Sequence, residues 1–510
     1  MNRKKLYSGI LAVCLAAATA LSSAACAKQN DNESGGEAGE VKKLFVDLHT
    51  LMPSASENAT PDQPHPVNAS RYIAAAYKTL SGTEIVWASD YAKPVDNINN
   101  ISAWFNQQIN IKNCPAVGFT FGTKMQEDGI YLDLGEYLER PNPYVAGNTR
   151  WKDLFEDWVW DDPAVTDANG KIVSIPIVLH PGSATAIYYN KDMFAENAMA
   201  VPSTWNEFVK TIDDAKKVPG IKYPYVPYTG DTGISLSSWA FRYCLAPGFA
   251  AHMAEKTDYD NSGTVSTNEL IRAVLEGKFN PNACQEAKAL YRLSYNYYKT
   301  VLPGGWESIT DTTYLNAWDE GKVAMKNQGL WYYTNEKSDV IRKFDFDLFA
   351  PPVAQSDSSS YASDLPKRKL SEGYKSQVLI SFNVMLPAVS GNEKLLESAI
   401  DFLMYLSMPE AVTAMVQENG AGLPAVKGAS YPSVYDDSAW LDREFTETNI
   451  SEWPLGFIES NTSNINAAFS DWVFGEKTEA EFFTVVNREQ QNGARTMVNS
   501  MKINTAGWNI

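Results

Sequence analysis

Cysteine, histidine and positive charge are scarce in this chain of 510 residues. It carries five cysteines, four histidines and 43 basic residues against 61 acidic ones, so the formal net charge is −18. Two cysteines fall within the first 26 residues, and the other three, Cys114, Cys244 and Cys284, are widely spaced. An odd number at such spacing forms neither a disulfide framework nor a zinc pattern. The acidic balance argues against nucleic acid as a partner, because phosphate binding requires clustered Lys and Arg.

The motifs of the common enzyme classes are missing as well. The scattered histidines form no H-E-x-x-H pair, and the chain has no G-x-S-x-G, Walker loop or dinucleotide fingerprint. We therefore expect a protein that is not an enzyme. A surface-anchored glycoside hydrolase stays open as the alternative, since it needs only two carboxylates roughly 5 to 10 Å apart. Its candidates lie in the segment EDWVWDD and are chosen by composition only: Glu156, Asp157, Asp161 and Asp162.

Long apolar runs are confined to the start of the chain. Basic residues at positions 3–5 precede an apolar segment from Ile10 to Leu21, and small residues follow up to Cys26. This order predicts a signal peptide over residues 1–25, because the apolar segment is shorter than the ~20 residues that span a bilayer. No later segment approaches that length without charge, so the protein is not itself expected to be a membrane channel.

Cys26 follows two alanines and resembles the lipobox of bacterial lipoproteins, in which the cysteine becomes the lipid-modified N-terminus. Ser23 stands where the lipobox usually has leucine, and ordinary secretion with cleavage near Ala25 is the alternative. After Cys26, residues up to 40 are polar and acidic and cannot bury enough apolar surface to fold, so they predict a flexible tether. We expect an extracytoplasmic protein, anchored by lipid to the outer face of the bacterial cytoplasmic membrane.

Strand and helix patterns alternate along the rest of the chain. Apolar segments at 44–48 and 84–88 predict strands on either side of an amphipathic helix at 71–80, and 116–121 predicts a further strand. Later helices are expected at 284–299, 393–406 and 409–419. The alternation favours an α/β fold with mostly parallel sheets flanked by helices. Roughly 480 residues are too many for one core, so at least two lobes are expected.

The most informative segment joins a strand end to a well-specified helix. Thr204 and Glu207 form a T-x-x-E capping box, and apolar residues recur at helical spacing from Trp205 to Ala215. The whole block, YNKDMFAENAMAVPSTWNEF, resembles the extracellular solute-binding proteins of bacterial ABC importers, the family that includes the maltose-binding protein. Two further blocks are similar to that family in order and spacing: GKVAM with GLW at 321–331, and SGNE at 390–393 with the helices that follow.

The resemblance implies the type II periplasmic-binding-protein-like fold, with two lobes joined by hinge crossovers. The N-terminal lobe is expected to comprise residues 41–180 plus 376–440, and the C-terminal lobe 181–375 plus 441–510. It also implies a monomer that captures an oligosaccharide and delivers it to the transmembrane subunits of an ABC permease. A glycan adhesin or sensor that uses the same fold without transport is the other alternative.

The aromatic content indicates the class of ligand. Fourteen tryptophans and 26 tyrosines exceed the needs of a core, and a flat ring suits the C–H face of a pyranose. By the resemblance, Tyr189 and Trp331 take the places of the sugar-stacking residues of the family. Trp239 and Trp306 lie in loop or helix-start segments and are further candidates, with core packing as the alternative. Partners for sugar hydroxyls are expected at the ends of N-terminal strands: Asp47, His49, Asp90 and Thr123.

Residues 258–269, DYDNSGTVSTNE, follow the spacing of an EF-hand calcium loop. The expected ligands are Asp258, Asp260, Ser262, the Thr264 carbonyl, Ser266 and Glu269, with Gly263 at the sharp turn. The alternative is an ordinary surface loop in which Ser266 and Glu269 form a capping box. A cap does not explain the two aspartates, the glycine or their spacing. We therefore expect a structural Ca²⁺ as cofactor, with Kd on the order of 10⁻⁴ to 10⁻³ M.

Overall fold

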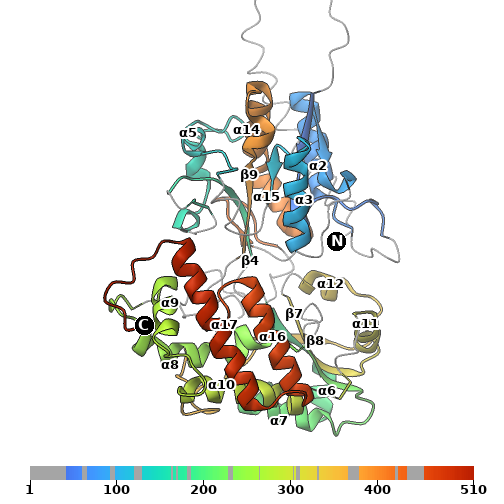
Figure 1. Cartoon of the computed structure of the whole chain (residues 1–510). Coiled ribbons are helices and arrows are strands. Elements are labelled where there is room, and N and C mark those ends of the chain that lie inside the picture. The colour runs from blue at the N-terminus through green and yellow to red at the C-terminus, as the bar shows by residue number, and fades with distance from the viewer. Residues whose placement is uncertain are drawn as a thin grey trace, which may run out of the picture. The chain divides into compact units, whose positions relative to one another are not determined.

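The chain forms two compact units in a computed structural model (Figure 1). Unit 1 comprises residues 1–180, 333–337 and 378–438, and unit 2 comprises 181–332, 338–377 and 439–510. The structure describes residues 42–59, 66–91, 98–119, 129–161, 165–167, 170–180, 185–227, 234–263, 265–302, 304–305, 311–329, 332–365, 378–419, 423–432 and 453–510. The predicted signal peptide, Cys26 and the tether therefore lie outside the described residues.

The sheet of unit 1 has six strands among the described residues, in the order β10-β4-β9-β3-β1-β2. Its strands are β1 (Lys42–Val46), β2 (Thr83–Trp87), β3 (Val117–Gly118), β4 (Ile175–His180), β9 (Val378–Val384) and β10 (Leu423–Pro424). β1 pairs in parallel with β2 and β3, whereas β9 runs antiparallel to both β3 and β4, and β10 antiparallel to β4. The prediction of mostly parallel sheets was wrong, because β9 joins the sheet after the chain has built most of unit 2 and runs against its neighbours.

The helices of unit 1 pack on this sheet and on one another (Figure 1). They are α2 (Ala69–Ser81), α3 (Ile98–Asn110), α5 (Gly135–Leu138), α13 (Leu386–Val389), α14 (Glu393–Leu406) and α15 (Pro409–Asn419). Residues 333–337 of α12 (Tyr333–Ser338) are assigned to the same unit. Helix α2 buries Ile73 and Tyr77 on one face and ends at Gly82, whose φ of 69° is left-handed. Within the described chain no single helix has the length and apolar composition of a membrane span, although α14 and α15, bent by 68°, meet that test as a pair.

The sheet of unit 2 has four described strands, in the order β6-β7-β5-β8. These are β6 (Tyr223–Val226), β7 (Val323–Gly329), β5 (Thr185–Asn190) and β8 (Phe346–Phe349). β6 and β7 are parallel, and β5 is antiparallel to both β7 and β8. Every residue of β5 and β7 is buried, so both faces of the sheet are covered.

Helices make up most of the rest of unit 2. They are α6 (Lys191–Glu196), α7 (Trp205–Ala215), α8 (Pro247–Thr257), α9 (Thr267–Leu275), α10 (Gln285–Asn296), α11 (Asp311–Asp319), α16 (Glu459–Phe474) and α17 (Glu479–Ser500). The capping box predicted for α7 is confirmed, since Thr204 and Glu207 make both reciprocal bonds. The helix predicted at 284–299 is α10 followed by a π-helical segment, η6 (Tyr297–Val301).

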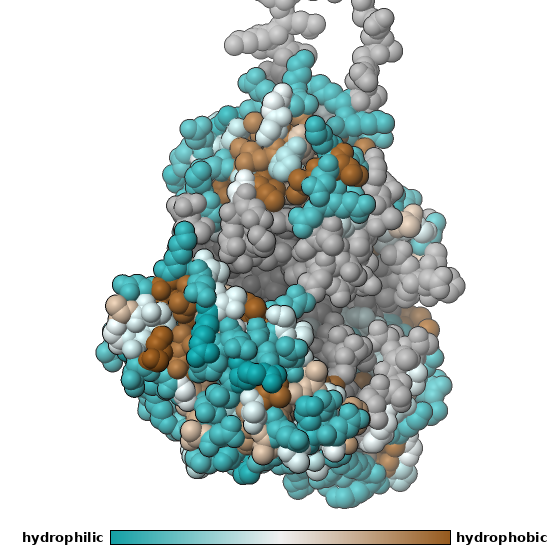
Figure 2. Space-filling model, viewed as in Figure 1, coloured by the Kyte–Doolittle hydropathy of each residue, from teal (hydrophilic) through white to brown (hydrophobic). Residues whose placement is uncertain are grey.

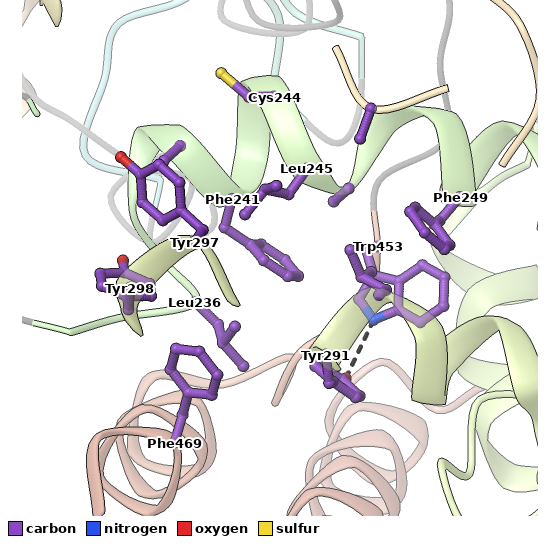
Figure 3. Close-up of a cluster of buried hydrophobic side chains, with 14 of the residues drawn as sticks. Leu236, Phe241, Cys244, Leu245, Phe249, Tyr291, Tyr297, Tyr298, Trp453 and Phe469 are labelled. Carbon is purple, nitrogen blue, oxygen red and sulfur yellow. Dashed lines mark hydrogen bonds between the residues drawn. The ribbon is translucent and has the colours of Figure 1, made fainter. Parts of the chain in front are cut away.

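A large aromatic core holds unit 2 together (Figure 3). Trp453 donates a hydrogen bond from Nε1 to the hydroxyl of Tyr291, 3.2 Å away, and both side chains are buried. Helix α17 approaches the chain at Gly456 so closely that a Cβ on Gly493 would lie 1.8 Å from the Gly456 carbonyl oxygen. In the view of Figure 2 the described surface of unit 2 is mostly hydrophilic, with hydrophobic side chains confined to small patches. Most apolar residues of unit 2 therefore lie in its core.

Candidate functional site

Trp239 is the N-cap residue of a short π-helical segment in unit 2. The segment, η5 (Ala240–Leu245), follows Trp239 directly, and π-helical turns are frequent at functional sites. The side chains of Trp239 and Tyr243 are both partly exposed, and their ring centroids lie 6.3 Å apart with an interplanar angle of 60°. The two rings together offer an apolar surface with polar edges, which suits a pyranose.

The segment that leads into Trp239 is fixed by hydrogen bonds from distant residues. The Tyr298 hydroxyl donates to the Ser235 carbonyl at 2.8 Å, and the Ser235 N–H donates back to that hydroxyl at 3.2 Å. The Leu236 N–H donates to Asn466 Oδ1 at 3.0 Å. The Ser238 hydroxyl accepts from the Phe241 N–H at 3.2 Å and so covers the first turn of η5. The sequence contained no sign of the bonds from Tyr298 and Asn466, because these residues lie 60 or more positions away from the segment.

Tyr189 does not present a ring face to the surface in this structure. Its side chain is 8 % exposed, and its ring lies 4.7 Å from Phe194 and 5.8 Å from Phe349 between centroids. Burial, together with nearby Asp347, raises the pKa of its hydroxyl. The expectation of a sugar-stacking role is therefore corrected: Tyr189 is a core residue of unit 2.

The YNKD block has a structural role instead. Asn190 caps helix α6, since its Oδ1 accepts from the Met193 N–H at 3.0 Å. Asp192 accepts a hydrogen bond from the Asp345 N–H at 3.0 Å and ties α6 to the chain before β8. These bonds give the Asn and Asp of the block a structural role, which accounts for their residue types.

Lys326, on β7, is fully buried and lies among aromatic rings. Its Nζ is 4.3 Å from the ring centroid of Trp318, and the rings of Tyr332, Tyr188 and Tyr314 lie 5.3, 5.7 and 5.8 Å away. Such cation–π contacts favour a charge that is out of reach of water. Trp318 is itself a core residue, since its side chain is 0 % exposed.

In unit 1, two of the predicted polar residues meet at the end of β1. Asp47 is fully buried and its Oδ1 accepts from the His49 N–H at 2.8 Å. His49 has a left-handed φ of 50° and stacks on Phe119 with centroids 4.5 Å apart. Strained non-glycine residues of this kind cluster at functional sites. Asp90 lies in the short helix η2 (Ala88–Tyr91) after β2, but its side chain is not among those described, and Thr123, Trp306 and Trp331 fall outside the described residues.

The predicted calcium loop brings its three carboxylates together. Asp258, Asp260 and Glu269 each offer an oxygen, and the three oxygens lie within 4.8 Å of one another. Gly263 has a left-handed φ of 81°, as the sharp turn requires. The capping box of the alternative prediction is present as well, because Ser266 and Glu269 make both reciprocal bonds at the start of α9. Thr264, the expected carbonyl ligand, lies outside the described residues.

Hydrogen bonds favour the ionised form of two of these carboxylates. Burial by itself raises the pKa of Glu269, but the N–H and hydroxyl of Ser266, with the N–H groups of Tyr259 and Asp260, bring it below its ordinary value. The hydroxyl and N–H of Ser262 lower the pKa of Asp260. Both groups therefore carry negative charge at neutral pH, as a Ca²⁺ ligand must. The residues present fit the cation.

Comparison with known proteins decides the family. The profile of the bacterial extracellular solute-binding proteins matches residues 107–441. The chain belongs to this family. Family membership places the protein outside the cytoplasm, as predicted, and gives no support to the alternative of a glycoside hydrolase.

Two relatives are similar over part of their length. An uncharacterised ABC transporter extracellular-binding protein of Pyrococcus horikoshii is 33 % identical over 213 residues, 41 % of each chain. The multiple sugar-binding protein of Streptococcus mutans is 23 % identical over 261 residues, 51 % of this chain and 53 % of that protein. The chain thus spans about half the length of the relatives that it matches.

Solved structures share the fold over nearly the whole chain. RafE in complex with raffinose has a TM-score of 0.52 at 16 % identity, covering 89 % of this chain and 99 % of that one. A solute-binding protein of Thermotoga lettingae bound with alpha-D-tagatose has a TM-score of 0.55 at 14 % identity, covering 89 % and 100 %. A family 1 extracellular solute-binding protein of Bifidobacterium longum subsp. infantis has a TM-score of 0.53 at 14 % identity, covering 89 % and 100 %. The periplasmic-binding-protein-like α/β fold predicted from the sequence is thereby confirmed.

Proposed function

We propose that the protein binds a carbohydrate, of the oligosaccharide class, and delivers it as a monomer to the transmembrane subunits of an ABC permease. The observation that carries the proposal is the partly exposed aromatic pair of Trp239 and Tyr243 in a member of the solute-binding family. The names of the relatives point the same way, since one is a multiple sugar-binding protein and two of the structures hold raffinose or tagatose.

The chemistry of a sugar ring explains the residues that we assign. The C–H face of a pyranose packs against Trp239, and Trp331 and Trp306 are proposed as further stacking residues. Asp90 is proposed as an acceptor for sugar hydroxyls. Nothing in this arrangement requires a reaction, so the sugar leaves chemically unchanged.

A binding screen followed by calorimetry tests this function. Soluble glycans are screened by thermal shift, and the best binder is titrated into the wild-type protein and into Trp239→Ala and Trp331→Ala. We expect a loss of affinity of up to about tenfold in each variant, since aromatic contacts contribute about 0.5 to 1.5 kcal/mol beyond the area that they bury. Trp508→Ala, a partly exposed tryptophan at the C-terminus, is the control and keeps full affinity. Full affinity in both site variants would reject the assigned site, and sugar fragments after prolonged incubation would favour the hydrolase instead.

The anchor forms the second part of the proposal. Lipid modification of Cys26 holds the binding protein at the outer face of the cytoplasmic membrane, close to its permease. Mass spectrometry of the membrane fraction is expected to find a diacylated N-terminal Cys26, and Cys26→Ser is expected to release the protein into the medium. A mature N-terminus without lipid in the wild-type protein would support ordinary secretion.

We infer further that the loop at 258–269 binds a structural Ca²⁺. The support is the EF-hand spacing in the sequence together with the convergence of Asp258, Asp260 and Glu269. Ser262, Ser266 and the Thr264 carbonyl complete the proposed ligand set. The ion supplies positive charge that binds three neighbouring carboxylates and ties the start of α9 to the end of α8.

A further inference from the structure

The approach to Trp239 is held by one hydroxyl group. Tyr298 bonds to both the carbonyl and the N–H of Ser235, and its hydroxyl lies 3.1 Å from Ser238 Oγ as well. Ser235 and Ser238 flank the turn that ends at Trp239. A single side chain therefore fixes both ends of this turn.

A second side chain holds the middle of the same turn. Asn466 on α16 accepts from the Leu236 N–H at 3.0 Å and donates from Nδ2 to Ser237 Oγ at 2.9 Å. Both ends of its amide are thus used. Leu236 is fully buried in the core, which prevents the turn from lifting away.

The two clamping residues stand on rigid supports. Tyr298 belongs to η6, is 6 % exposed, and its ring lies 5.1 Å from Tyr297 and 5.6 Å from Phe469 between centroids. Phe469 is on α16, three residues after Asn466. Figure 3 shows Leu236, Tyr298 and Phe469 in one corner of the aromatic core. The turn is consequently braced against two helical segments that come much later in the chain.

We propose that Tyr298 and Asn466 are positioning residues that preorganise the aromatic surface of Trp239 and Tyr243. Neither residue is assigned a contact with ligand. They hold the turn Ser235–Ser238 in one conformation and thereby fix the orientation of the Trp239 indole. The entropy cost of ordering this turn when a sugar binds is therefore small. The proposal rests on the proposed carbohydrate function, because it concerns the same site.

The first test needs no sugar. Protein labelled with 5-fluorotryptophan is studied by ¹⁹F NMR, and the Trp239 resonance is assigned with Trp239→Phe. We expect one narrow line in the wild type, and a broadened or split line in Tyr298→Phe and Asn466→Ala, where the turn samples several conformations. Asn466→Asp is expected to restore a narrow line, because the carboxylate still accepts from the Leu236 N–H, and the Ser237 hydroxyl, an acceptor in the wild type, becomes its donor.

The matched control is Tyr295→Phe. Tyr295 precedes Tyr298 by one helical turn and stacks on Trp472 with centroids 4.6 Å apart, so this variant removes a hydroxyl from the same region without touching the turn. Its Trp239 line is expected to match the wild type. A wild-type line in both Tyr298→Phe and Asn466→Ala would overturn the proposal.

The second test uses raffinose as the probe in calorimetry. Tyr298→Phe is expected to weaken raffinose binding by about three- to tenfold. In the background of Trp239→Leu, where the flat ring is gone, it is expected to have no further effect. An equal loss in both backgrounds would mean a general structural defect and would overturn the positioning role. Unchanged affinity in Trp239→Leu would count against the assigned site. A wild-type protein that does not bind raffinose would count against the sugar class. In both cases the NMR test still decides whether Tyr298 and Asn466 hold the turn.

Discussion

Glu418 caps a helix that begins 350 positions earlier in the chain. Its carboxylate accepts hydrogen bonds from the Asn68 N–H at 2.7 and 2.8 Å and from the Ala69 N–H at 2.7 Å. These groups open α2, and Asn68 supplies no side-chain cap of its own. The negative charge also lies at the positive end of the helix dipole. A residue of α15 thereby stabilises α2 within unit 1.

Removal of this remote cap is expected to destabilise the protein. Glu418→Ala should lower the free energy of unfolding by about 1 to 2 kcal/mol, the usual value of a helix cap, because two N–H groups lose their acceptor. Glu418→Gln should lose less, since one oxygen remains. Urea unfolding monitored by circular dichroism measures both variants, and equal stability of Glu418→Ala and the wild type would contradict the role.

Gly493 is expected to tolerate no side chain. A Cβ at this position would lie 1.8 Å from the Gly456 carbonyl oxygen, so Gly493→Ala must push α17 away from the chain at Gly456. We expect a loss of about 3 kcal/mol or more, at the upper end of the cost of overpacking. Asn492→Ala, an exposed change on the same helix, should be neutral or slightly stabilising. A Gly493→Ala variant that melts with the wild type would refute the close approach.

Acid is expected to weaken unit 2 through Glu276. Burial tends to raise its pKa, but the Tyr259 hydroxyl, the Arg272 guanidinium and the Asn509 N–H lower it from the ordinary value of 4.5 to about 2. Because the folded pKa is the lower one, this stabilisation is fully present above about pH 4.5 and is lost as the pH falls toward 2. Melting temperatures recorded between pH 6 and pH 2.5 should fall less steeply for Glu276→Gln. Parallel curves for the two proteins would exclude this contribution.

Calcium is expected to raise the melting temperature. A cation that binds only the native state stabilises it, so millimolar Ca²⁺ should raise the melting temperature above that in excess chelator. Asp258→Asn should abolish the shift, since it removes a proposed ligand but keeps the capping box of Ser266 and Glu269. Mg²⁺ at the same concentration controls for ionic strength. An identical melting temperature with Ca²⁺ and with chelator would mean that the loop is an ordinary capped turn.

Substitutions of Tyr189 test its assignment as a core residue of unit 2. Its ring packs between Phe194 and Phe349, so Tyr189→Ala should lower the free energy of unfolding by about 3 to 5 kcal/mol. Tyr189→Phe keeps the ring and should leave both stability and sugar affinity close to those of the wild type. A loss of affinity in Tyr189→Leu, in protein that is still folded, would restore the flat ring of Tyr189 to the binding site.

Local features were predictable because their partners lie within one helical turn. The capping boxes of Thr204 with Glu207 and of Ser266 with Glu269 join residues three positions apart, and both are confirmed. The carboxylates of the predicted calcium loop also converge, since the loop closes over twelve residues. The family blocks identified the fold by type and order of residues, although the YNKD block proved to mark a helix cap.

The sequence by itself determined the family, the α/β class, the starts of several helices and the spacing of the calcium loop. Only the tertiary structure decided that β9 runs against β3 and β4, that Tyr189 is enclosed, and that Tyr298 and Asn466 hold the turn before Trp239. The physical reason is the range of the contacts involved. A hydrogen bond between residues three positions apart leaves a pattern in the sequence, whereas one between residues 63 or 230 positions apart leaves none until the chain has folded.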